Sequence, residues 1–156
     1  MKVWLIIMRF VWYYDFPIGK IGIASENGEI TDVSFGYIDG IENETSEIKQ
    51  CALELWEYFD GKRKEFTIPI KYSGTPFQKA VLDATRTIPY GETRSYGDMA
   101  HMTGNPRAAR AVGNAIHRNR LLILIPCHRI IQGDGSLGGY AGREDIKRYL
   151  LNLEKF

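Results

Sequence analysis

The stretch ILIPCHRII, residues 123–131, places a cysteine between two short apolar runs. Cys127 is followed directly by His128 and Arg129. A thiol reacts as the thiolate, so a nucleophilic cysteine needs a base or a positive charge close by, and this stretch offers both. The other reading is that Cys127 is a small apolar residue of the core. The stretch by itself leaves both readings open.

The apolar run at residues 121–125 is rich in branched side chains and predicts a short buried strand. Pro126 cannot donate to a sheet ladder and therefore marks the end of that strand. We expect Cys127 to lie where the backbone leaves the sheet. Side chains of neighbouring residues on an extended chain point to opposite sides, so a proton relay from Cys127 to His128 requires a bridging water or a kinked backbone.

The composition is that of an ordinary globular protein, with 156 residues, 44% hydrophobic and 25% charged. This length allows one domain or two small ones. Two cysteines, Cys51 and Cys127, make neither a disulfide framework nor a metal site and favour a reducing compartment. The apolar run at residues 3–8 is too short for a secretory leader or a membrane span. We therefore expect a cytoplasmic protein with no membrane association.

The charges divide the chain into two halves. Residues 1–70 carry 7 Lys and Arg against 12 Asp and Glu, a balance of −5. Residues 71–156 carry 13 against 7, a balance of +6. We expect a domain boundary in the polar segment KYSGTP, residues 71–76, and a surface on the second domain that faces a polyanion such as nucleic acid. The alternative is a solvated basic face.

The first half predicts a small antiparallel sheet with one helix. Strands are expected at residues 3–14, 21–25 and 30–37, with a hairpin turn at Glu26-Asn-Gly-Glu. A helical apolar pattern runs from Ser46 to Phe59, and residues 66–70 predict one more strand. Nothing in this half is typical of a catalytic site, so we assign residues 1–70 a mainly structural role.

The second half predicts helices. Thr75 and Pro76 are typical of a helix start, and Ser95-Tyr-Gly-Asp predicts the start of a second helix that ends near Met102. Gly104 interrupts it, and Asn105 followed by Pro106 predicts a third helix over residues 107–118. Two helices joined by a three-residue turn that contains glycine form the helix-turn-helix pattern.

The last of these helices has an unusual surface of small residues with arginines between them. We expect this surface to contact nucleic acid closely and without sequence preference, because a helix that reads base sequence in the major groove normally carries large polar side chains, which this helix lacks. The alternative is tight helix packing. The predicted contact residues are Arg107, Ala108, Ala109, Arg110, Ala111 and Gly113, with Arg110 able to insert between bases.

Five glycines lie in residues 132–142, which match no phosphate-binding motif, and Tyr140 in this segment is able to stack on a planar ligand. Residues 143–155 predict a final helix. Glu154 lies near its end, where the helix dipole disfavours a negative charge. We therefore ask whether Glu154 has a partner such as His128, the alternative being a solvated surface carboxylate.

From about Thr75 to Glu154 the chain resembles the O6-alkylguanine-DNA alkyltransferase family. The resemblance rests on TPFQ at 75–78, IPYGETRSYGDMA at 88–100, GNPRAARAVGNAIHRN at 104–119 and ILIPCHRII at 123–131. It implies an α/β (α+β) protein, with a small N-terminal sheet and helix followed by a mainly helical, winged-helix-like domain. It also implies DNA repair, in which the alkyl group of O6-alkylguanine moves irreversibly and stoichiometrically to Cys127. O4-methylthymine is a further candidate substrate.

The resemblance implies a role for each site residue. Cys127 becomes the acceptor, His128 its water-mediated base and Glu154 the carboxylate that orients His128. Tyr96 donates a proton to the leaving guanine, and Asn119 joins the recognition helix to the site.

Arg110 fills the gap left by a flipped nucleotide. The walls of the base pocket are Pro126, Tyr140, Ala141 and Gly142, with Ala141 standing where many relatives carry serine. The resemblance implies a monomer that contacts double-stranded DNA in the minor groove, with no cofactor and no metal.

Two other functions fit the same residues. One is a DNA-binding module without transfer activity, although inactive relatives lack the acceptor that Cys127 supplies. The other is a hydrolase that uses Cys127, His128 and Glu154, which the basic second half disfavours.

Overall fold

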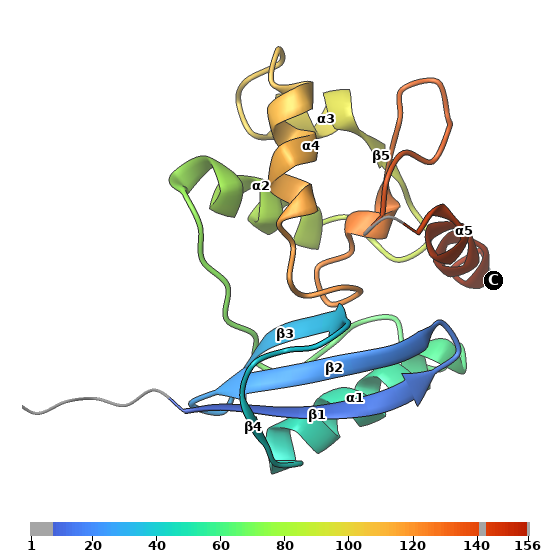
Figure 1. Ribbon diagram of the computed structural model, residues 1–156. Helices are drawn as coiled ribbons and strands as arrows, with labels where there is room; N and C mark the ends of the chain where they lie inside the picture. The colour runs from blue at the N-terminus through green and yellow to red at the C-terminus, as the bar shows by residue number, and fades with distance from the viewer. Residues whose placement is uncertain (1–7, 141–142, 156) are drawn as a thin grey trace, which may run out of the picture. The chain divides into compact units, whose positions relative to one another are not determined.

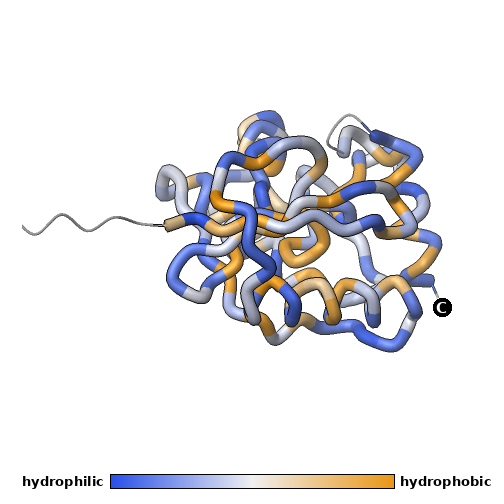
Figure 2. The backbone as a smooth tube through the Cα atoms, turned by 60° about the horizontal axis from the view of Figure 1, so that its bottom comes forward, coloured by the Kyte–Doolittle hydropathy of each residue, from blue (hydrophilic) through white to orange (hydrophobic). Residues whose placement is uncertain are grey.

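The computed structural model describes residues 8–140 and 143–155 and divides the chain into two compact units, Met1–Lys71 and Tyr72–Phe156. The predicted mixed α+β class is confirmed, with a sheet and one helix in the first unit and mostly helices in the second (Figure 1). Hydrophobic and hydrophilic residues are interspersed along the described backbone (Figure 2), and each unit contains buried apolar residues.

The first unit is built on a four-stranded sheet in the order β3-β2-β1-β4. Strands β1 (Arg9–Phe16), β2 (Gly19–Glu26) and β3 (Glu29–Phe35) form the predicted antiparallel meander. The turn between β2 and β3 has positive φ at Asn27 and Gly28, as a two-residue hairpin requires. The short strand β4 (Ile41–Glu42) pairs parallel to β1.

Helix α1 (Ser46–Phe59) packs along the sheet, where Phe16 lies between the rings of Trp56 and Phe59 at centroid distances of 4.7 and 5.5 Å. The same helix carries a fully buried carboxylate, Glu54. Its oxygens accept hydrogen bonds from the backbone N–H groups of Thr67 and Ile68, at 2.7 and 3.3 Å. Glu54 therefore fixes the segment after α1 to the helix.

The second unit contains five helical segments and two very short strands. Helices α2 (Pro76–Arg86) and α3 (Tyr96–Met102) begin at the predicted caps, Thr75 and Ser95. Both caps are complete capping boxes, which the sequence predicts from Ser95 to Asp98 and not from Thr75 to Gln78. Helix α4 (Ala109–His117) packs against α2 and α3. The remaining elements are β5 (Arg94–Ser95), the 3₁₀ turn η1 (Cys127–Arg129), β6 (Ile130–Ile131), which pairs parallel to β5, and α5 (Glu144–Leu153).

The predicted strand at residues 121–125 is wrong. These residues are all buried, but they form a turn in which the Ile125 N–H donates to the Leu121 carbonyl at 2.9 Å and Ile123 has a φ of 72°. The apolar pattern correctly reports burial, but no neighbouring strand is available to pair with the run. The strand expected at residues 66–70 is reduced to a single bridge between Ile30 and Ile70.

The third predicted helix begins later than expected. Residues 105–108 form a turn, in which the Arg107 N–H donates to the Asn105 side chain at 3.3 Å, and the helix starts at Ala109 instead of residue 107. Asn105 therefore caps a turn and not the helix, and the connection from α3 to α4 is longer than three residues. The final helix is likewise shorter than residues 143–155, and residues 3–7 of the first expected strand lie outside the described residues.

Glu54→Ala should destabilise the first unit by about 3 kcal/mol, because two backbone N–H groups lose their acceptor. Trp4, Trp12 and Trp56, the only tryptophans, all belong to this unit, so tryptophan fluorescence during urea unfolding reports on it alone. The half-buried neighbour Glu57, replaced in the same way, serves as the control and should change stability by less than about 0.5 kcal/mol. Equal losses in the two variants would contradict the pinning role of Glu54.

Candidate active site

Cys127 lies on a 3₁₀ turn instead of an extended strand end. The Cys127 N–H donates to the Ile125 carbonyl at 2.8 Å, and the Arg129 N–H donates to the Pro126 carbonyl at 2.9 Å. The backbone is therefore kinked at the cysteine. This kink means that the opposite orientations expected of an extended chain do not apply to Cys127 and His128.

Asn119, just after α4, holds the loop that carries the cysteine. Its side-chain oxygen accepts from the Leu121 N–H at 3.0 Å, and its Nδ2 donates to the Ile125 carbonyl at 3.0 Å and to Cys127 Sγ at 3.2 Å. One side chain thus closes the loop from residue 119 to residue 127 and contacts the sulfur itself. This geometry places Asn119 between the end of α4 and the site, where the sequence predicts it.

The predicted pairing of His128 with Glu154 is present. Glu154 is the C-cap residue of α5, and its Oε2 lies 2.5 Å from His128 Nε2. The same carboxylate accepts from Arg129 Nε at 2.8 Å, Arg129 Nη2 at 3.2 Å and the Gly91 N–H at 3.3 Å. Arg129 also donates to the Ile88 carbonyl at 2.7 Å. Glu154 is buried, so the solvated alternative is excluded.

This network determines which nitrogen of His128 is free to accept a proton. A carboxylate accepts, so the proton of the neutral imidazole lies on Nε2 and the lone pair lies on Nδ1. Burial lowers the pKa of His128, and Glu154 opposes that change, which leaves the ring neutral at pH 7. Nδ1 is buried and has no hydrogen-bond partner among the described residues. It is therefore available to accept a proton.

A buried lysine accompanies the thiol. Burial raises the pKa of Cys127, while the Asn119 amide and the positive charge of Lys147 oppose the rise. Lys147, on α5, donates to the carbonyls of Ile130 at 2.5 Å and Gly139 at 3.3 Å. Burial lowers its own pKa to about 8, so it is charged at neutral pH. The sequence reasoning missed Lys147, although its position next to Ile146 on the apolar face of the last helix was a signal.

Two tyrosines border the cysteine. Tyr96, at the start of α3, is half-buried, and a Cβ on Gly138 would meet its hydroxyl at 3.0 Å. Gly138 also has a φ of 74°, so the loop needs glycine there on both counts. Burial raises the pKa of Tyr96, which keeps it protonated. Tyr140 is 3% exposed, and its hydroxyl has no hydrogen-bond partner in the structure.

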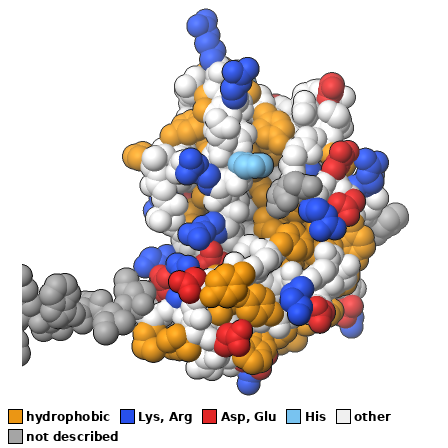
Figure 3. All heavy atoms as spheres, in the orientation of Figure 1, with side chains coloured by type: hydrophobic (Ala, Val, Ile, Leu, Met, Phe, Trp, Pro, Cys, Tyr) orange, Lys and Arg blue, Asp and Glu red, His pale blue; other side chains and the backbone are white. Residues whose placement is uncertain are grey.

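The arginine and small-residue surface lies on α4 and the turn before it, and lysine and arginine side chains gather over this end of the unit in Figure 3. Arg110 and Ala111 are exposed, and Ala109 and Gly113 are half-buried. Arg107 is exposed on the turn. Ala108 differs from the expectation, because it is buried at 8% exposure and does not belong to the exposed face.

Pro126 is buried beside Cys127, and the two other predicted wall residues, Ala141 and Gly142, lie outside the described residues.

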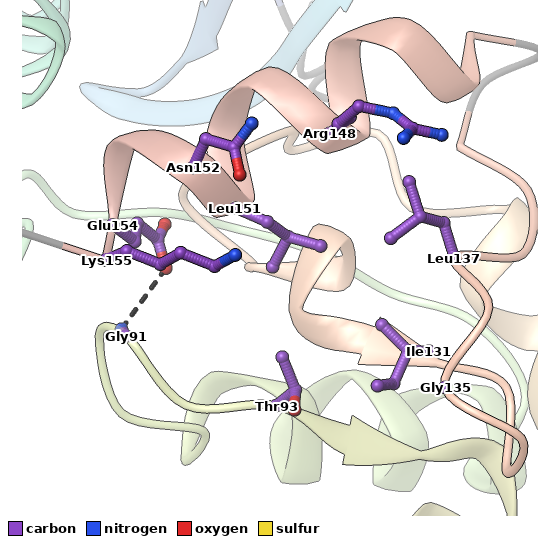
Figure 4. A pocket seen from close by; sticks show the side chains of 10 residues that line it. All are labelled: Gly91, Thr93, Ile131, Gly135, Leu137, Arg148, Leu151, Asn152, Glu154 and Lys155. Atoms are coloured by element: carbon purple, nitrogen blue, oxygen red, sulfur yellow. Dashed lines mark hydrogen bonds between the residues drawn. The ribbon is translucent and has the colours of Figure 1, made fainter.

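A pocket of about 510 Å³ is lined by residues 136–140 together with Gln132, Arg143 and Glu144. A second pocket, of about 300 Å³, is lined by Glu154 and other residues of α5 and by the segment that carries Gly91 (Figure 4). Cys127 belongs to the lining of neither.

Comparison with known proteins decides the family. Residues 76–156 match the DNA-binding domain of 6-O-methylguanine DNA methyltransferase, and residues 10–72 match the ribonuclease-like domain of the same enzyme. The chain belongs to the methylated-DNA–protein-cysteine methyltransferase family. This confirms the resemblance and extends it to the first unit, which the sequence motifs did not cover.

Several members of the family align over nearly the whole chain. The constitutive methyltransferase of Bacillus subtilis is 41% identical, covering 95% of this chain and 96% of its own length. The Mycobacterium bovis protein is 51% identical, covering 90% and 89%. The crystal structure of Mycobacterium tuberculosis OGT in complex with DNA superposes with a TM-score of 0.85 at 39% identity, covering 94% of this chain and 93% of that one.

Within the described residues, no three His, Cys, Asp or Glu side chains are grouped as a metal site would require. No helix in the part of the chain that the structure describes is long and apolar enough to cross a membrane.

Replacing Lys147 should alter the pH dependence of stability. The folded protein releases this proton near pH 8, whereas the unfolded chain holds it to about pH 10.5. The unfolded state therefore binds more protons between these values, and the wild type should gain stability relative to Lys147→Met as the pH rises from 8 to 10.5, by on the order of 1 kcal/mol. Urea unfolding in a Cys127→Ser background removes the titration of the thiol. A difference that stays constant over this range would show that Lys147 titrates normally.

Proposed function

We propose that this chain repairs DNA by transferring the alkyl group of O6-alkylguanine, above all O6-methylguanine, to Cys127. The observation that carries the proposal is the buried cysteine on its 3₁₀ turn, bonded to Asn119 and preceding a histidine whose Nε2 lies 2.5 Å from Glu154. The family relatives at 40 to 51% identity bear the name of this activity. The cysteine argues against a DNA-binding module without transfer.

The chemistry follows from the geometry. Cys127 loses its proton through a water molecule to His128 Nδ1, and the sulfur attacks the alkyl carbon. The new S–C bond forms as the C–O6 bond breaks, and the electron pair of that bond stays on guanine. Tyr96, kept protonated by burial, donates a proton to the base, and its own proton is replaced from solvent. O4-methylthymine presents the same alkyl–oxygen bond and is a second candidate substrate.

DNA reaches this site if the damaged nucleotide is flipped out of the duplex, which costs a few kcal/mol. The exposed face of α4 supports minor-groove contact, because the small residues Ala111 and Gly113 allow close approach and the exposed Arg110 has a side chain long enough to occupy the stack. Contacts of this kind read the DNA backbone. Binding is therefore independent of sequence and sensitive to salt.

The reaction as written needs neither a cofactor nor a metal, since the thiol is the only acceptor and the thioether is stable. Each molecule therefore acts once. Cys51 and Cys127 are both free thiols, and an acceptor thiol stays reduced most readily in the cytoplasm, where we place the protein. One acceptor site completed within one chain supports action as a monomer.

Mixing the protein with a duplex that contains O6-methylguanine should add the mass of one methyl group, located at Cys127 by peptide mapping. Cys127→Ser should gain none, whereas Cys51→Ser, a change to the other thiol, should react like the wild type. An unchanged mass would exclude methyl transfer. Repeated turnover on an ester with Cys127 unmodified would instead favour the hydrolase.

Arg110→Ala should slow repair of duplex DNA at least about tenfold while leaving the reaction with free O6-benzylguanine within about twofold, because only the duplex needs the gap filled. Arg148→Ala removes another exposed arginine, on α5, and controls for the loss of one positive charge. Single-turnover rates on both substrates provide the measurement. Equal losses of Arg110→Ala on the two substrates would contradict the base-replacement role.

A further inference from the structure

Two buried polar atoms without partners lie in the same small region as Cys127. Four such side-chain atoms occur in the described part of the chain, and two of them are His128 Nδ1 and the Tyr140 hydroxyl. A buried polar group without a partner costs free energy, so each needs an explanation. The two rings meet edge to face, with centroids 6.2 Å apart and planes at 90°.

The two atoms are chemically complementary. His128 Nδ1 is an acceptor, because Glu154 fixes the proton of the neutral ring on Nε2. The Tyr140 hydroxyl donates one hydrogen bond and accepts others. Since the two groups make no direct hydrogen bond, a single molecule between them would satisfy both. Cys127 belongs to the same group, because it directly precedes His128 on the 3₁₀ turn η1. Its charge, after burial, also raises the pKa of Tyr140.

We propose that the Tyr140 hydroxyl is a positioning residue of the proton relay, holding the water that connects Cys127 Sγ to His128 Nδ1. This inference rests on the proposed transfer reaction and assigns Tyr140 a task besides walling the base pocket. A buried water in proteins typically makes about three hydrogen bonds, and these three atoms supply that number.

The proton balance is simple. Cys127 gives its proton to the water oxygen while the water passes one of its own protons to His128 Nδ1. One S–H and one water O–H bond break, one water O–H and one N–H bond form, and the electron pair stays on sulfur. Tyr140 donates to the water oxygen throughout and is not consumed. Without this donor the water keeps only two hydrogen-bond partners, Cys127 and His128, and its orientation is less well defined.

Other charged and titratable groups surround the relay and affect its pH dependence. They approach from three elements and are unchanged by a substitution of Tyr140. They are Tyr96 on α3, Arg129 on η1, Lys147 on α5 and Glu154 at the C-terminal end of α5.

Tyr140→Phe tests the inference, since it keeps the ring and its contact with His128 and deletes the hydroxyl. We expect the single-turnover rate with O6-benzylguanine to fall about tenfold at neutral pH, the effect of one lost hydrogen bond. The loss should disappear at alkaline pH, where the thiol ionises without the relay. Tyr149→Phe, which deletes the hydroxyl of a tyrosine with 42% exposure on α5, is the matched control and should react like the wild type.

A double-mutant cycle separates positioning from pocket shape. In a His128→Asn background the relay is already broken, so Tyr140→Phe should cause less than about a twofold further loss. A loss that is equal at every pH, or one that persists in full in the His128→Asn background, would assign Tyr140 to the pocket wall alone. An unchanged rate in Tyr140→Phe would also overturn the inference.

A second measurement does not depend on alkyl transfer. The pH dependence of iodoacetamide modification at Cys127, followed by mass, reports ionisation of the thiol directly. Tyr140→Phe should shift this profile to higher pH, and an unshifted profile would refute the relay role. If the wild type shows a pH-dependent iodoacetamide reaction at Cys127 but no methyl transfer, the proposed function fails. The comparison of this reaction with that of Tyr140→Phe still tests the relay.

Discussion

The buried carboxylate of Glu154 is the interaction on which the site depends. It accepts from two segments that are distant from it in the sequence, through Gly91 in one and through His128 and Arg129 of η1 in the other. An isolated carboxylate in the interior would be strongly unfavourable, and the ion pair with the Arg129 guanidinium offsets the cost of burying its charge. A carboxylate accepts from the imidazole and so fixes its tautomer. The same contact that stabilises the fold therefore determines which nitrogen of His128 can accept a proton.

The cysteine is held from the other side by Asn119, so two independent networks meet at one short turn. The loop between them includes Ile123, a branched residue with a φ of 72°, a conformation that costs free energy. Five consecutive buried apolar side chains at residues 121–125 and the hydrogen bonds of Asn119 keep the loop in this shape. The position of the sulfur is thus determined by burial and by one amide, and not by a sheet.

What the sequence predicted correctly was mostly local. The Asn27-Gly28 turn, the Thr75 cap and the Ser95 capping box are contained within four residues each, so neighbours along the chain decide them. The strand at residues 121–125 failed because an apolar run indicates burial but not pairing. Lys147 was missed because the helical pattern places it next to the apolar Ile146 but does not show that carbonyls of other segments offset the cost of burying its charge. Glu154 was found because a carboxylate at a helix C-terminus conflicts with the helix dipole and requires a partner.

Burial has two opposite effects on the thiol, and the site separates them. Removing water raises the pKa of Cys127, which makes the thiolate harder to form. The same removal leaves a thiolate without the hydration shell that weakens it as a nucleophile in water. Lys147, the Asn119 amide and the relay through His128 act only on the first effect, since they stabilise the anion or accept its proton. The buried position of Cys127 is therefore compatible with reactivity because Lys147, Asn119 and the relay oppose the rise in its pKa.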